Sequence, residues 1–180
     1  MKLNLIKKIK YLYLVFRIFF LSVNWYESFA KRKIIKGKIK NKKIKLVVLK
    51  SKIKANKFYL HNYFNNYKDK LKRFNKKNYF IVLTKNKHLL SSGWIYFGNK
   101  WKITEINLNI KLGKKYLLYD FETPKNLRNQ GHYTLLLSLI QKKFYGNKLA
   151  IYSLSNNYES NRAIKKSGFK FTKKLTNRLF

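Results

Sequence analysis

The chain has no cysteine, one proline, seven glycines and only six acidic residues among its 180 amino acids. Without cysteine it can form no disulfide, no cysteine-ligated zinc site, no iron–sulfur cluster and no thiol nucleophile. The scarcity of proline and glycine excludes collagen-like, mucin-like and linker-dominated chains. What is present is 46% hydrophobic and 17% aromatic residues. These proportions and the length predict one folded domain with its own core.

The shortage of acids leaves a formal net charge of +37, carried by 37 lysines and 6 arginines. Such a surface attracts polyanions in a salt-dependent way, as RNA-associated and ribosomal proteins do. Arginine, however, is the side chain that makes bidentate contacts to phosphates and bases, and it is rare here. Lys, Asn, Ile, Tyr and Phe are abundant together, as an AT-rich coding sequence produces. The charge therefore predicts non-specific nucleic-acid binding and leaves the activity open.

Residues 1–30 combine apolar side chains at helical spacing with basic ones on another face, which predicts a basic amphipathic helix. The longest apolar run, Tyr11 to Val23, is shorter than the roughly 20 residues of a membrane span and contains Arg17. The same arginine interrupts any signal-peptide apolar region. The helix can lie on an anionic membrane surface or pack on the domain. We expect residues 1–42 to be a basic N-terminal extension, residues 43–180 to be the domain, and the protein to be cytoplasmic, free or membrane-associated.

Hydrophobic spacing then predicts the elements of the domain. Residues 43–49 favour an edge strand flanked by lysines, and residues 57–76 a helix. An antiparallel meander follows, with strands at residues 79–84, 88–97, 101–110 and 116–122. Next come a helix, a strand, a helix and a strand, at residues 134–144, 149–153, 157–167 and 169–173. This order predicts an α+β fold with a mixed sheet, parallel where 116–122 meets 149–153, and helices on both faces.

The junction between strand 116–122 and helix 134–144 has the residues of an anion site. Gly131 stands where the helix begins, so free backbone N–H groups and the positive end of the helix dipole point outward. Arg128 and Lys125 add full charges nearby, and a glycine lets a pyrophosphate approach the backbone closely. This turn is therefore predicted to bind phosphate.

Two motifs over about residues 78–173 resemble the acyl-CoA-binding half of GNAT-family N-acetyltransferases. The turn from Arg128 to Tyr133 is similar to the family's Gln/Arg-x-x-Gly-x-Gly/Ala, with Tyr133 in place of the last small residue, a departure found in some members that act on sugars. Many members have Pro-Glu-Tyr ahead of the arginine, and here Pro124 stands one residue early. The family's Asn-x-x-Ser-x-x-x-x-x-Lys-x-Gly-Phe is reproduced without a gap by Asn157, Ser160, Lys166, Gly168 and Phe169.

The resemblance implies acetyl-CoA, or another acyl-CoA, as cosubstrate, and no metal. It implies that the glycine turn holds the pyrophosphate and that the pantetheine lies in a notch between the two parallel strands. The cofactor contacts that it implies are made by Phe121, Glu122, Arg128, Asn129, Gln130, Gly131, His132, Tyr133, Asn157 and Ser160. His61 and His88 have no metal-ligand spacing.

Acyl transfer to an amine needs a base, a donor that polarises the thioester carbonyl and a proton for the departing thiolate. Asp120 and Glu122 share one face of their strand, so they are candidates for the base, for binding the cationic amine, or for ordinary ion pairs. A backbone N–H of the same strand is the expected donor to the carbonyl. Many GNAT members use a tyrosine as the general acid at the position of Ile164, which leaves Tyr158 and Tyr133 as candidates.

The expected function is transfer of an acetyl or short acyl group to the primary amine of a small molecule. A nucleotide-linked amino sugar of a surface polysaccharide precursor is favoured by the Tyr133 variant, by a basic N-terminus suited to a membrane surface, and by the positive field. Three alternatives stay open: an RNA- or ribosome-associated protein, a GNAT enzyme that acetylates a ribosomal protein, and a fold relative without catalysis.

Overall fold

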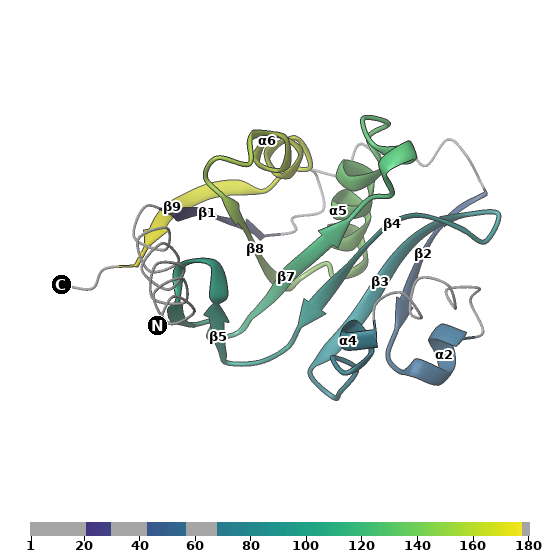
Figure 1. The fold of residues 1–180 in the computed structure, drawn as a ribbon, viewed down its shortest axis with the longest axis horizontal. Coiled ribbons are helices and arrows are strands. Elements are labelled where there is room, and N and C mark those ends of the chain that lie inside the picture. The colour runs from purple at the N-terminus through teal and green to yellow at the C-terminus, as the bar shows by residue number, and fades with distance from the viewer. Residues whose placement is uncertain (1–20, 30–42, 57–67, 178–180) are drawn as a thin grey trace, which may run out of the picture.

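The computed structural model describes residues 21–29, 43–56 and 68–177, which form a seven-stranded sheet, a two-stranded sheet and four α-helices (Figure 1). The strands are β1 Ser22–Phe29, β2 Ile44–Leu49, β3 Asn78–Lys85, β4 His88–Tyr96, β5 Lys100–Ile103, β6 Leu108–Lys111, β7 Lys115–Glu122, β8 Lys148–Leu154 and β9 Lys170–Thr176. The helices are α2 Lys52–Asn56, α4 Lys68–Leu71, α5 His132–Lys143 and α6 Tyr158–Lys166. None of these helices is long and apolar enough to span a membrane.

The large sheet has the order β2-β3-β4-β7-β8-β1-β9 and confirms the expected mixed α+β fold. β2, β3, β4 and β7 pair antiparallel in turn, with the lysine-flanked β2 at the edge. β7 and β8 pair in parallel, with α5 as the crossover between them. This parallel step after an antiparallel meander was predicted from the order of the strands and helices along the sequence.

The segment expected as the third meander strand, residues 101–110, is a different structure. It belongs to the separate hairpin β5–β6, which turns through a 3₁₀ helix, Thr104–Ile106, and a left-handed Asn107 (φ 48°). β4 therefore pairs directly with β7. The prediction was wrong because alternating residues fit a hairpin arm as well as a sheet strand. The hairpin buries its own apolar side chains against the sheet, through Ile103, Ile106 and Leu112.

The helix expected over residues 1–30 is wrong for Ser22–Phe29, which forms β1 between β8 and β9. Val23 and Trp25 are buried toward the β5–β6 hairpin, and Tyr26 is buried on the opposite side. A strand that is covered on both faces has no polar side. The spacing of its apolar residues therefore does not distinguish it from a helix. β1 is thus part of the domain. The other parts of the expected extension, residues 1–20 and 30–42, lie outside the described residues, as do residues 57–67 of the helix expected at 57–76.

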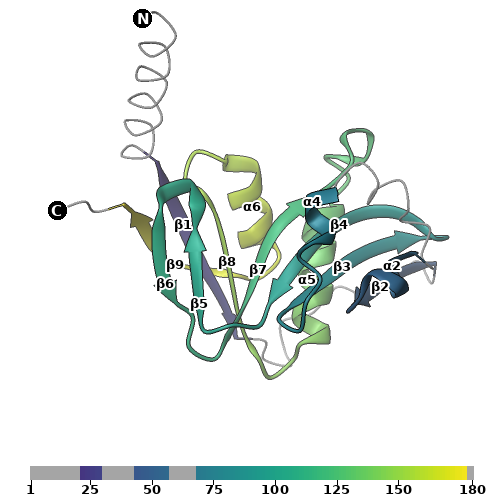
Figure 2. The same ribbon diagram turned by 60° about the horizontal axis from the view of Figure 1, so that its bottom comes forward.

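Layers cover both faces of the large sheet, as Figure 2 shows. α5 and α6 pack on one face, and α2, α4 and the β5–β6 hairpin pack on the other. β3 illustrates the division, because Ile81 and Leu83 face the α5 side while Phe80 and Val82 face the α4 side. The sheet is therefore the middle layer, and its interior strands are buried on both sides.

A β-bulge shapes the end of β7. The pairing with β4 passes from Trp94↔Tyr119 to Ser92↔Glu122, so two residues of β7 lie opposite Gly93 alone. Asp120 has a left-handed backbone (φ 49°), a conformation that aspartate tolerates better than most residues. The Phe121 ring lies so close to Gly93 that a Cβ there would be 2.4 Å from it. The bulge and the glycine together fix where β7 ends.

Replacing Gly93 with alanine should lower the free energy of unfolding by about 1–3 kcal/mol, because the new methyl group must displace the Phe121 ring. Urea unfolding of both proteins measures the difference. In a Phe121→Ala background the same replacement should cost much less, since the ring is absent. If the replacement lowers the free energy of unfolding equally in the two backgrounds, the contact with the Phe121 ring does not restrict position 93.

Candidate functional site

A cavity of about 760 Å³ opens where β7 and β8 stop pairing. Their parallel pairing ends at Leu118↔Ile151, although both strands continue, and Figure 1 shows them diverging. β8 stays paired with β1 along its length, so the sheet remains intact beside the opening. The N-terminal turns of α5 and α6 border the same cavity, through Gly131 and Asn157.

Most of the residues predicted from sequence line this cavity. They are Asp120, Phe121, Glu122, Arg128, Asn129, Gly131, His132, Tyr133, Asn157 and Ser160. Three predicted residues do not line it: Lys125, Gln130 and Tyr158. The Gln130 amide turns back to donate to the Asn126 carbonyl (3.2 Å). The side chain of Tyr158 is 78% exposed, so its expected role as general acid is not supported.

The start of α5 has the features of an anion site. Gly131 is the N-cap residue with a left-handed backbone (φ 76°), and as a glycine it has no side chain to cap the first turn. The first backbone N–H groups of α5 are therefore available to an anion, and the helix dipole favours negative charge there. Arg128 lies at the same edge, with its Nε donating to the Thr123 carbonyl at 3.2 Å. The phosphate-binding turn predicted from sequence thus faces the cavity.

The start of α6 is built differently, because its first turn already has an acceptor. The Asn157 side-chain oxygen accepts a hydrogen bond from the Ser160 N–H at 3.1 Å. This is an N-cap bond, which stabilises a helix by about 0.5–2 kcal/mol. The Ser160 hydroxyl lies 3.5 Å from the Tyr133 hydroxyl, so the two helix N-termini meet through side chains.

Asn161, which the sequence analysis did not select, fixes the position of α6. Its Nδ2 donates to the Leu154 carbonyl at 2.9 Å, and its Oδ1 accepts from the Tyr26 hydroxyl at 2.8 Å. These bonds join α6 to the end of β8 and to β1. No local motif marks Asn161, because its partner Tyr26 is 135 residues away in the sequence.

The Tyr133 side chain lies between α5 and the end of β7. Its ring centroid lies 5.4 Å from that of Phe121. Burial raises the pKa of Tyr133 to about 12, so the hydroxyl stays protonated at neutral pH. Of the two tyrosines considered as general acids, this one lines the cavity.

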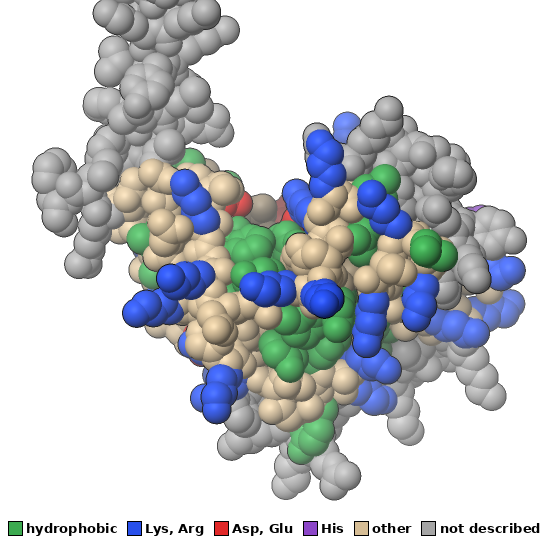
Figure 3. Space-filling model, turned by 90° about the horizontal axis from the view of Figure 1, so that it is seen from below, with side chains coloured by type: hydrophobic (Ala, Val, Ile, Leu, Met, Phe, Trp, Pro, Cys, Tyr) green, Lys and Arg blue, Asp and Glu red, His purple; other side chains and the backbone are tan. Residues whose placement is uncertain are grey.

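Four of the chain's six acidic residues line this one cavity: Glu105, Asp120, Glu122 and Glu159. In Figure 3 the acidic side chains appear at a hollow, while lysines and arginines are spread over the rest of the visible face. Glu105 and Tyr152 were missed by the sequence analysis. Glu105 lies in the β5–β6 hairpin, which was expected to be a strand of the meander. Burial raises the pKa of Tyr152 to about 12. The rarity of acids was the one available signal for Glu105.

Asp120 and Glu122 converge on one cation, which agrees with their predicted shared face. Lys70 Nζ lies 3.0 Å from Glu122 Oε2 and 3.5 Å from Asp120 Oδ2. Arg73 also pairs with Asp120. The two carboxylates therefore form ion pairs, and the group that they bind is a primary ammonium. The same arrangement can bind an external amine.

No protein-family model matches the chain, and no curated protein matches its sequence. Solved structures do match. A functionally unknown conserved protein from Staphylococcus epidermidis has a TM-score of 0.59 at 11% identity, covering 86% of this chain and 59% of that one. A GNAT-family acetyltransferase from Colwellia psychrerythraea has a TM-score of 0.50 at 13% identity, covering 84% and 53%. The aminoglycoside N-acetyltransferase AAC(6')-Iy in complex with CoA has a TM-score of 0.50 at 9% identity, covering 76% and 93%.

The chain therefore has the fold of GNAT acetyltransferases, as the sequence resemblance implied. It spans between one half and two thirds of the length of the first two structures that it matches.

His132, the first residue of α5, should make binding of a phosphate ester depend on pH. Burial, and then the nearby Lys85, lower the pKa of His132 below its ordinary value. A phosphate at the start of α5 favours the protonated ring, so binding raises this pKa and takes up a proton. Affinity for CoA should therefore increase as the pH falls through the pKa that the ring has in the complex, by roughly tenfold for each unit by which binding raises this pKa.

Calorimetric titrations with CoA between pH 5.5 and 8 measure this dependence. His132→Gln removes the titrating ring and should show only the weaker pH dependence of CoA's own phosphates. Identical profiles for the two proteins would exclude His132 from the phosphate site.

Proposed function

We propose that the protein is an acyl-CoA-dependent N-acyltransferase, which moves an acetyl or short acyl group to the primary amine of a small molecule. This proposal rests on the residues and backbone groups that line one cavity. Its α5 side offers uncapped helix N–H groups and Arg128 for phosphates, and its β7 side offers carboxylates for an amine. The cavity lies where two parallel strands diverge, in a fold shared with GNAT acetyltransferases.

In the proposed complex, the CoA pyrophosphate binds at the start of α5 and the pantetheine follows the gap between β7 and β8. The thioester carbonyl then lies beside the last residues of β7, beyond Leu118, where pairing with β8 has ended. A backbone N–H in this part of β7 polarises the carbonyl, as an oxyanion donor does in other acyl transfers.

In the proposed reaction the acceptor nitrogen loses two protons and the departing thiolate gains one. Asp120 or Glu122 binds the acceptor ammonium and takes its first proton, and the free amine attacks the thioester carbon. The N–C bond forms as the C–S bond breaks. Tyr133, kept protonated by its burial, gives its proton to the departing thiolate, and the second proton that the nitrogen releases restores the tyrosine hydroxyl. These roles combine electrostatic binding with acid–base catalysis and require no covalent enzyme intermediate.

We propose an amino sugar as the acceptor. Asp120 and Glu122, whose carboxylates hold the Lys70 ammonium, favour a substrate that is cationic at its reacting end. The fold neighbour AAC(6')-Iy is named for acetylating aminoglycosides, which are amino sugars. We further propose that the reaction takes place in the cytoplasm, where acyl-CoA is available, with the basic chain free or at an anionic membrane surface.

Replacing Gly131 with tryptophan should weaken acetyl-CoA binding by at least roughly tenfold, since charge-assisted hydrogen bonds contribute about 1.5–3 kcal/mol each. The residue has a positive φ and open space around its Cβ direction, so the ring would occupy the phosphate site and strain the turn. Gly113→Trp is the matched control, because Gly113 also has a positive φ (61°) and open space but does not line the cavity. Calorimetry at physiological salt measures both variants.

The same titration separates the proposal from the RNA-binding alternative. RNA attracted by the general positive charge should bind both glycine variants and the unaltered protein alike. If the unaltered protein binds RNA tightly at physiological salt and does not bind acetyl-CoA, the acyltransferase proposal is wrong.

A further inference from the structure

The amine bound by the two candidate base carboxylates belongs to the protein itself. Lys70 reaches them from α4 with its side chain only 14% exposed, and Nζ lies 3.0 Å from Glu122 and 3.5 Å from Asp120. We propose that Lys70 is a self-acylation site, which receives the acyl group from bound acyl-CoA when no external amine is present. This inference rests on the proposed function.

The placement of Lys70 allows the amine and the cofactor to approach without blocking each other. α4 packs on the face of the sheet that α2 and the β5–β6 hairpin share, whereas α5 packs on the opposite face (Figures 1 and 2). The lysine therefore comes to the end of β7 from one face, and the phosphate site lies at a helix of the other. Asp120 and Glu122 flank Phe121, so the ammonium is held beside the part of β7 where the thioester is proposed to bind.

The chemistry is the same as that proposed for an external acceptor. The Lys70 ammonium gives a proton to Glu122 or Asp120, and Nζ attacks the thioester carbon. The N–C bond forms and the C–S bond breaks. Nζ releases its second proton, which the thiolate takes up, directly or through the Tyr133 hydroxyl, to leave as the CoA thiol. The product is an amide at Lys70, and acyl-CoA is the only co-reactant.

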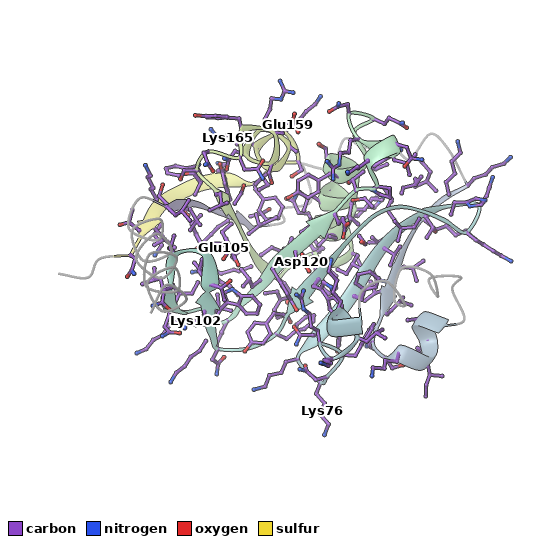
Figure 4. All side chains as sticks on the ribbon, in the orientation of Figure 1. Lys76, Lys102, Glu105, Asp120, Glu159 and Lys165 are labelled. Carbon is purple, nitrogen blue, oxygen red and sulfur yellow. The ribbon has the colours of Figure 1, made fainter. Side chains whose placement is uncertain are left out.

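Lys70 differs in its surroundings from a surface lysine. Two carboxylates orient its amine, and Arg73 pairs with one of them, Asp120. Lys76, a few residues further along, is exposed and projects away from the sheet in Figure 4, whereas Asp120 lies toward the middle of the molecule. Acetyl-CoA modifies exposed lysines slowly and without selectivity, so selective acylation of Lys70 requires an amine held beside a bound thioester.

Acylation would also change the site, because an amide carries no charge. Lys70 would lose its attraction to Glu122 and Asp120, while Asp120 keeps its ion pair with Arg73. Glu122 would then be better able to bind the ammonium of an external acceptor. Self-acylation of Lys70 thus favours the amine-binding state of the same site.

The test is incubation of the whole protein with ¹³C-labelled acetyl-CoA, without an acceptor, followed by peptide mass spectrometry. The labelled fraction at Lys70 should exceed that at Lys76 by at least roughly tenfold, as expected for a positioned amine. The rate constant for labelling of Lys70 should not depend on protein concentration, because the transfer is intramolecular. Gly131→Trp should abolish the excess at Lys70, and Gly113→Trp should retain it.

Two lysine variants complete the experiment. Lys70→Arg keeps a cation for the carboxylates but removes the acylatable amine, so selective labelling should disappear while the melting temperature is retained. Lys76→Arg should leave labelling of Lys70 unchanged. If the protein binds acetyl-CoA and acylates an added amine, but Lys70 is labelled no more than Lys76, self-acylation is excluded and the proposed function stands. If acetyl-CoA does not bind, both proposals fail.

Discussion

The candidate site depends on how short the pairing of β7 with β8 is. The two strands pair in parallel for only four residue pairs and then separate. Two features maintain the separation. β1 holds β8 along its other edge, and the bulge at Asp120 changes the course of β7 against β4. The sheet therefore opens locally without losing its continuity. Because α5 is the crossover between the two strands, its N-terminus faces the opening and brings its dipole with it.

Local rules were sufficient for the half of the fold that contains this opening. The apolar runs of β3, β4 and β7, the helical spacing of α5 and α6, and the glycine at the start of α5 are all short-range signals. They predicted the parallel step, and together with the family resemblance they predicted ten of the residues that line the cavity, including Arg128, Tyr133 and Ser160. Sequence patterns failed where long-range pairing decides. β1 is buried on both faces and has no alternation, and the β5–β6 hairpin alternates like the strand that it was taken to be.

The net charge of the chain differs from the distribution of charge around the cavity. A net charge of +37 describes the outer surface, where lysines are spread widely. Four of the six acids lie around one cavity, so the local field there differs from the mean field of the molecule. Salt screens interactions between exposed charges beyond about 8 Å at physiological ionic strength, so the distant lysines have less influence on a bound substrate than these nearby carboxylates. Net charge alone suggests an anionic partner, such as CoA, and gives no sign of a cationic acceptor.

The position of β1 has a consequence for how the chain folds. β1 is the first of the described strands to be synthesised, yet its two neighbours, β8 and β9, are the last. During translation its apolar side chains, Val23, Trp25 and Tyr26, must wait for almost the whole domain before they can be buried. Such late, distant pairings slow folding and leave a strand open to incorrect contacts on the ribosome. The strand that completes the sheet beside the cavity is thus also the described strand that must wait longest for its partners.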